Sequence, residues 1–133
     1  MNKFMIAELK GFLLANNIEQ VVANDNAVIF RKGGLSFLFQ HSTDDPYYFR
    51  LSLPKVALAK NIANVDINDL EVQYKVMKIT IVDGDVWIVA EQFVYCRENL
   101  SSLFTRLITL LEEVLKALKE KLQASTNVKD ETE

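Results

Sequence analysis

The sequence predicts an α+β fold, in which an antiparallel sheet of five to six strands is combined with an N-terminal, a middle and a long C-terminal helix. Two observations lead to this prediction. The strands come in hairpins rather than in strand–helix–strand units, and the apolar spacing becomes helical at both ends of the chain. The expected order is helix, three strands, helix, two strands, helix, with residues 19–23 as a candidate for one further strand and the helices segregated around the sheet.

Length, charge and cysteine content narrow the class of protein. The chain has 133 residues, one cysteine and a net charge of −3 at pH 7. We predict one domain over residues 1–123 and a disordered acidic tail over 124–133. There is no basic field for nucleic acid, no run of about 20 apolar residues to span a membrane, and no disulfide framework. We therefore expect a cytoplasmic protein with no metal, cofactor, nucleic-acid partner or membrane partner.

The first helix is expected over residues 3–16. Four apolar side chains share one face of this helix, namely Met5, Leu9, Phe12 and Leu13. Asn16 and Asn17 can end the helix, because asparagine tolerates the left-handed conformation found at helix C-termini.

Short strands are expected next, at residues 19–23, 27–32 and 35–41. Asn24 to Asn26 form a turn between the first two, and Gly33-Gly34 supplies the positive φ angles of a tight hairpin between the second and third. In the third strand the core side is predicted to carry Leu35, Phe37 and Phe39.

A further strand is expected over residues 47–53, and Pro54 is expected to end it. Its core side would carry Tyr47, Phe49, Leu51 and Leu53, while Tyr48, Arg50 and Ser52 point away. The middle helix is placed between residues 55 and 74, with Asn61 or Asn64 as its cap. Its buried face would carry Val65, Leu70 and Tyr74.

The clearest hairpin joins residues 75–82 and 85–95 through Asp83-Gly84, a dipeptide that favours a type I′ turn. Met77, Ile79 and Ile81 alternate on one side of its first strand. The second strand is apolar on both faces from Val86 to Ala90, which indicates a central strand covered on both sides.

The final helix is expected from residue 100 or 101 to Leu122, with Asn99 as a plausible N-cap. Most of its long apolar stripe is expected in the core. Any excess beyond what a small sheet covers would be buried at a dimer or partner interface. The stripe consists of Leu100, Leu103, Phe104, Leu107, Ile108, Leu111, Val114, Leu115, Leu118 and Leu122.

Three residues are candidates for the centre of an enzyme site or ligand-sensing pocket. His41 is the only histidine, and no sequence signal joins it to Cys96. An arginine beside Cys96 would favour a reactive thiolate. Glu91 lies in an apolar strand, where a carboxylate needs a partner such as a cross-strand Arg50 or Lys78. No catalytic motif accompanies these residues, so we expect a protein that is not an enzyme and has no catalytic residues.

Aromatic side chains favour binding instead. Trp87, Phe93 and Tyr95 form a row along one strand, and an exposed aromatic such as Tyr48 could anchor a partner. The candidate partner-binding residues are Tyr48, Arg50, Trp87 and Glu91.

Three blocks of sequence resemble the YbjN-like bacterial proteins, described as sensory transduction regulators, whose fold is type III secretion chaperone-like. They are FRKGGLSFLF at 30–39, DPYYFRLSLP at 45–54, and YKVMKITI at 74–81 with DGDVWIVAEQF at 83–93. The resemblance covers roughly residues 3–122 and offers no catalytic constellation. Because secretion chaperones of this fold are dimers that hold an extended client segment, it implies a homodimer with a protein or peptide partner and a chaperone-like or regulatory role.

Overall fold

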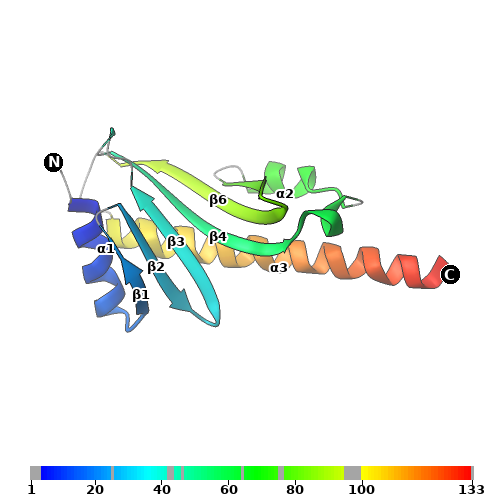
Figure 1. The fold of residues 1–133 in the computed structure, drawn as a ribbon, viewed down its shortest axis with the longest axis horizontal. Coiled ribbons are helices and arrows are strands. Elements are labelled where there is room, and N and C mark those ends of the chain that lie inside the picture. Colours follow the sequence, from blue (N-terminus) through cyan, green and yellow to red (C-terminus); the bar gives the residue numbers. More distant parts are fainter. Residues whose placement is uncertain are drawn as a thin grey trace.

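The computed structural model describes residues 4–24, 26–41, 44–45, 47–63, 65–74, 77–94 and 100–132, with side chains as far as residue 124. Within them, a six-stranded antiparallel sheet has the order β1-β2-β3-β4-β6-β5. Helices α1 and α3 lie together on one face of the sheet (Figure 1), which confirms the predicted α+β arrangement. The elements are α1 (Phe4–Ala15), β1 (Glu19–Ala23), β2 (Ala27–Lys32), β3 (Leu35–His41), β4 (Tyr48–Leu58), the 3-10 helix η1 (Ala59–Ile62), α2 (Asn68–Gln73), β5 (Met77–Val82), β6 (Asp85–Phe93) and α3 (Leu100–Thr132).

Local sequence signals end α1 and form the two tight hairpins as predicted. Asn17 adopts a positive φ of 55° directly after α1. Gly33 and Gly34 have φ angles of 58° and 77°, and Lys32 pairs with Leu35 across them. Asp83 and Gly84 have φ angles of 50° and 81°, as a type I′ turn requires.

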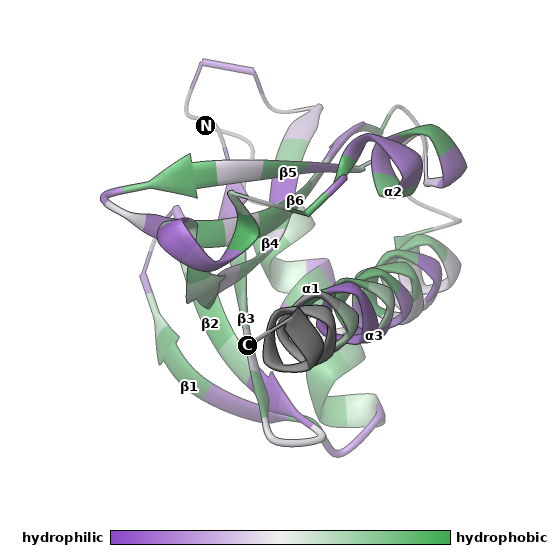
Figure 2. Cartoon of the chain, turned by 90° about the vertical axis from the view of Figure 1, so that its right-hand side faces the viewer, coloured by the Kyte–Doolittle hydropathy of each residue, from purple (hydrophilic) through white to green (hydrophobic). Residues whose placement is uncertain are grey.

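The core lies between the sheet and the helices, and its side chains come from both layers. Figure 2 shows the ribbon of the sheet and the helices that pack on it. Phe104 of α3 is the centre of the core, with ring centroids 5.6 Å from Phe12, 6.1 Å from Phe39 and 5.8 Å from Phe49. The predicted core faces of α1 and β3 are confirmed, and α1 adds Ile6. Rings from α1, β3, β4 and α3 therefore meet in one cluster.

Strand β4 corrects one prediction, because it does not end at Pro54 but continues to Leu58. The pairing of β4 with β6 shifts register between Leu53 and Ala57, and Lys55 has a φ of 54°. Proline has no N–H to give to a ladder, and a bulge is a place where a strand tolerates it. Tyr47 was also misplaced, since it precedes the strand and is exposed instead of facing the core.

The middle helix occupies only the second half of the expected segment. Asn61 lies inside η1, and Asn64 lies outside the described residues. The N–H of Asn68 donates to Oδ1 of Asp66 (3.0 Å), so an aspartate turn leads into α2 in place of an asparagine cap. Leu70 is buried as predicted.

Helix α3 runs to Thr132, through most of the segment 124–133 for which a disordered tail was expected. No glycine or proline occurs after Leu122 to stop the helix. Its apolar stripe is taken up by the core, with Leu103 and Leu122 partly buried. The predicted cap Asn99 lies outside the described residues.

Lys32 of β2 ties the sheet to this helix through Glu112, with Nζ 3.1 Å from both carboxylate oxygens. Among the helices in the described residues, none is long and apolar enough to cross a membrane.

Candidate functional site

The four candidate binding residues lie on one face of the sheet, the face turned away from α1 and α3, which we call the outer face. Arg50 of β4 pairs in register with Glu91 of β6, and Tyr48 pairs with Phe93. Side chains alternate along a strand, so these residues and Trp87 point opposite to the core residues between them. Within the described part of the chain no helix covers this face (Figure 2).

Apolar side chains gather on the outer face. The rings of Tyr48 and Phe93 are tilted against each other with centroids 5.4 Å apart, and Phe93 is 52% exposed. Val89 is buried but does not belong to the core cluster, so the larger side chains around it on this face must cover it. We call this group the outer patch; it consists of Ile29, Leu38, Tyr48, Trp87, Val89 and Phe93.

Strand β6 was expected to be covered on both sides. One of its faces does pack into the core, but the other face carries Trp87 and Val89 into the outer patch, with no described helix above them. Strand β6 is a central strand as predicted, since it pairs with β4 and β5, but its second face forms an aromatic outer surface that no described helix covers.

Charged side chains divide the patch, because the Arg50–Glu91 pair lies between the Tyr48–Phe93 pair and the Ser52–Val89 pair. Nη2 of Arg50 lies 2.9 Å from Oε1 of Glu91, and Nζ of Lys78 lies 3.4 Å from the same oxygen. Both cross-strand cations proposed from the sequence are thus partners of Glu91. The cluster contains two cations and one anion, and all three side chains remain partly exposed.

The environment of Glu91 keeps its carboxyl ionised. Partial burial by itself raises the pKa of this carboxyl, but the hydrogen bond from Arg50 and the charge of Lys78 outweigh burial, and the pKa is lowered. A general acid or base works best with a pKa near the operating pH, and this pKa moves away from neutrality. For Arg50, burial lowers the pKa of the guanidinium, and the interactions with Glu91 and Tyr48 raise it by more.

Two polar atoms of the outer face stand out. Among the described residues, the hydroxyl of Ser52 and the indole Nε1 of Trp87 are buried side-chain atoms without a hydrogen-bond partner. They come from neighbouring strands, β4 and β6, because Ser52 pairs in register with Val89. A buried polar atom without a partner costs about 1–3 kcal/mol.

The alternative site around Glu91, His41 and Cys96 is not assembled in the described residues. His41 ends β3, is buried, and pairs in register with Phe49, which faces the core. Glu91 lies on the outer face, so the sheet separates the two side chains. Cys96 lies outside the described residues. No group of three potential metal ligands occurs in the part of the chain that the structure describes.

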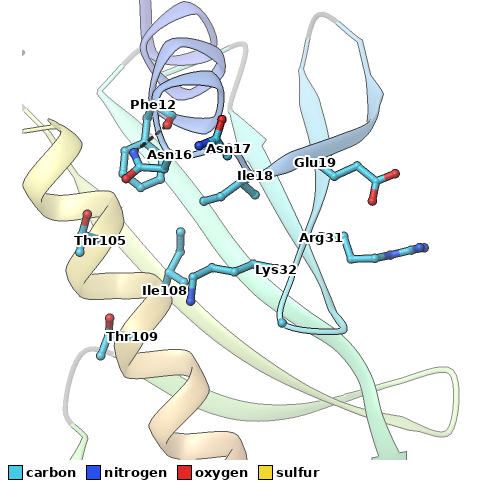
Figure 3. Close-up of a pocket in the computed structure, with 11 residues that line it drawn as sticks. Phe12, Asn16, Asn17, Ile18, Glu19, Arg31, Lys32, Thr105, Ile108 and Thr109 are labelled. Carbon is cyan, nitrogen blue, oxygen red and sulfur yellow. Dashed lines mark hydrogen bonds between the residues drawn. The ribbon is translucent and has the colours of Figure 1, made fainter.

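A hollow of about 390 Å³ lies elsewhere, between the end of α1, the β1–β2 edge and α3 (Figure 3). Lys32 reaches into it towards α3, whereas Glu19 and Arg31 point away (Figure 3). The ammonium of Lys32 is held by Glu112, and Nδ2 of Asn16 donates to the Phe12 carbonyl. The hollow is lined by amides, hydroxyls and apolar side chains, and Lys32, the charged side chain that reaches into it, is already paired with Glu112.

No known protein-family profile matches the chain, and the curated proteins contain no match. The resemblance to YbjN-like proteins accordingly stays a prediction.

Sequence reasoning did not select Phe93, Lys78 or Ser52 as site residues. Phe93 belongs to an aromatic row in the sequence, and Lys78 is a predicted partner of Glu91. Strand alternation and the pairing of β4, β5 and β6 place both on one surface. Nothing in the sequence indicates that Ser52 is fully buried on a face that no described helix covers.

Proposed function

We propose that this chain is a non-enzymatic interaction domain that binds a protein or peptide through the outer face of its sheet. The observation that carries the proposal is the outer patch, an aromatic and aliphatic surface on a sheet face left open by the described helices. Large exposed apolar patches are typical of interaction sites.

The composition of the patch suits a binding surface. Tyrosine and tryptophan are enriched among the residues that dominate interface energetics, because they bury a large area at small entropic cost. Phe93 and Tyr48 offer their rings together, and the Arg50–Glu91–Lys78 cluster lies between these rings and Val89. A partner that covers both apolar parts of the patch would contact the charged cluster between them.

An enzymatic function is less well supported. His41 and Glu91 lie on opposite sides of the sheet, and the hollow beside α1 contains neither of them. A catalytic site needs its groups within hydrogen-bond reach of one substrate. No described geometry meets this requirement for the three residues selected from the sequence.

Homodimer formation remains part of the proposal, but for a different reason from the one the sequence suggested. The apolar stripe of α3 is used in the core, which removes the excess that pointed to an interface. The edge of the sheet at β5 supplies another reason, because β5 is the last strand in the strand order. The chaperone-like or regulatory role and the cytoplasmic location stay predictions.

A pull-down tests the proposal. The tagged protein and two tagged variants are each incubated with a lysate of the host, and the proteins that each one retains are compared. Phe93→Ser removes an exposed ring from the outer patch, and Leu14→Ser removes a side chain that is 82% exposed on α1. We expect a protein that the unmodified chain and Leu14→Ser both retain and that Phe93→Ser loses.

Binding should then be measured with that protein after purification. Loss of an anchoring aromatic typically costs about 2 kcal/mol or more, so Kd should rise roughly 30-fold for Phe93→Ser. Circular dichroism must show that the variants are folded. Equal retention by both variants, or no retained protein at all, would refute binding through this face.

A further inference from the structure

The two edges of the sheet differ in how they are protected. Strand β1 has five residues, and its pairing with β2 shifts register between Gln20 and Val22. Short edge strands and bulges are devices that prevent edge-to-edge pairing. Strand β5, at the other end of the strand order, pairs with β6 over its full length without a shift and contains no proline or glycine. Of the two edges, β5 is the one open to another strand.

The side chains of β5 favour strand pairing. Ile79, Thr80, Ile81 and Val82 are all β-branched. Ile81 is 55% exposed and Val82 39% exposed, although Ile81 shares a face with the buried Met77 and Ile79. An isoleucine on the core side of an edge strand, only half covered, gains burial when another strand is added beside it.

The free backbone groups of β5 can be located from the hairpin. A two-residue type I′ turn closes on a hydrogen-bonded pair, here Val82 and Asp85. Hydrogen-bonded and non-hydrogen-bonded pairs alternate, so Thr80 is bonded towards β6. The N–H and C=O groups of Ile79 and Ile81 therefore point to the open edge.

The two ends of β5 carry opposite charges. Asp83 and Asp85 stand at one end of β5, and Lys78 stands near the other. Lys78 shares the single carboxylate of Glu91 with Arg50, which leaves one positive charge uncompensated in that cluster. Antiparallel pairing of two such strands brings the acidic end of each beside the basic end of the other, whereas parallel pairing brings like charges together.

We propose that two copies of the chain associate through β5, antiparallel and centred on Thr80, to form one continuous sheet. The segment Ile79-Thr80-Ile81 reads the same in both directions, so Ile79 of each copy lies beside Ile81 of the other. The outward N–H and C=O groups of Ile79 in one copy bond to those of Ile81 in the other copy. Lys78 of one copy then lies beside Val82 of the other and next to that copy's acidic turn. The proposed β5 pairing specifies the interface of the homodimer, and it rests on the homodimer formation included in the proposed function.

The geometry has a consequence for the binding surface. A two-fold axis perpendicular to the sheet keeps both outer faces on the same side. Two six-stranded sheets then form a single sheet of twice six strands, with two outer patches side by side. One partner could contact both patches, which strengthens binding through effective concentration.

Cross-linking tests the register. In the Cys96→Ser background, Thr80→Cys places one thiol on the two-fold axis, at a non-hydrogen-bonded pair where opposite Cβ atoms approach to about 4.5–5.5 Å. Val21→Cys on β1 is the matched control, an exposed position on the other edge. Mild oxidation should convert Thr80→Cys, and not Val21→Cys, into a covalent dimer.

Light scattering after size-exclusion chromatography gives the mass without a cross-link. The unmodified protein should have the mass of two chains, and Ile81→Lys, at a side chain exposed in the single copy, should have the mass of one while remaining folded. A single-chain mass for the unmodified protein overturns the proposal. A dimer that survives Ile81→Lys and gives no cross-link at residue 80 overturns the β5 interface. Neither result depends on the outer patch, which the Phe93→Ser retention experiment tests separately.

Discussion

Replacing Ser52 by alanine should stabilise the protein. Its hydroxyl is fully buried on the outer face and has no hydrogen-bond partner, a state that costs about 1–3 kcal/mol. Alanine removes this cost and leaves a cavity of one oxygen atom, which costs about 0.3 kcal/mol at the ~24 cal/mol per Å³ found for cavities. The net expectation is a gain of about 1 kcal/mol in the free energy of unfolding.

Urea denaturation followed by circular dichroism measures this gain as a higher midpoint with an unchanged slope. Thermal unfolding should shift upwards by about 3–5 °C for a chain of this size. Ser36→Ala on β3 is the control, because it makes the same substitution at an exposed strand position, where the change should stay within about 0.5 kcal/mol. A loss of about 1 kcal/mol in Ser52→Ala would show that the hydroxyl is bonded in solution and would refute the reasoning.

Three further predictions concern the core, the ion cluster and a turn. Phe104→Ala removes the ring on which three other rings pack, and should lower the free energy of unfolding by about 3–5 kcal/mol in urea titrations; a loss below about 1 kcal/mol would contradict this packing. Glu91→Gln should cost less than about 1 kcal/mol at neutral pH, because the pairs are partly exposed, and added salt should shrink the difference. Since the pKa of Glu91 is lowered on folding, its contribution is present above the unfolded value of about 4.3 and disappears as pH falls through the folded pKa; a difference that grows in acid would refute the assignment. Gly84→Ala should destabilise by about 1 kcal/mol or more, measured by thermal unfolding, because a φ of 81° suits glycine, whereas Gly11→Ala within α1 should not destabilise.

The parts of the fold that local chemistry decides could be predicted from the sequence. Glycine pairs and Asp-Gly place the hairpins because few residues accept positive φ, and alternation along β3 places Phe37 and Phe39 in the core. The continuation of β4 past Pro54 could not be predicted in this way. It depends on a bulge formed against β6, a strand far away in the sequence.

Part of the candidate site could also be predicted from the sequence. Alternation alone puts Tyr48 and Arg50 on one face, and an opposite charge at Glu91 predicts the cross-strand pair. The same alternation would have placed His41 on the core side with Phe39, away from Glu91. That the described helices all leave this face open is a property of tertiary packing, and no local pattern encodes it.

The position of Phe104 in the chain affects the order in which the protein can fold during synthesis. The rings of Phe12, Phe39 and Phe49 are made early, whereas the ring that joins them belongs to the last helix. A chain emerging from the ribosome therefore leaves the part of the sheet's apolar side that α3 covers exposed until α3 has been released, a state in which chaperones commonly act. A chain that stops before Leu100 should accordingly lack the cooperative thermal transition of the full-length protein, and a retained transition would show that the sheet holds together without its last helix.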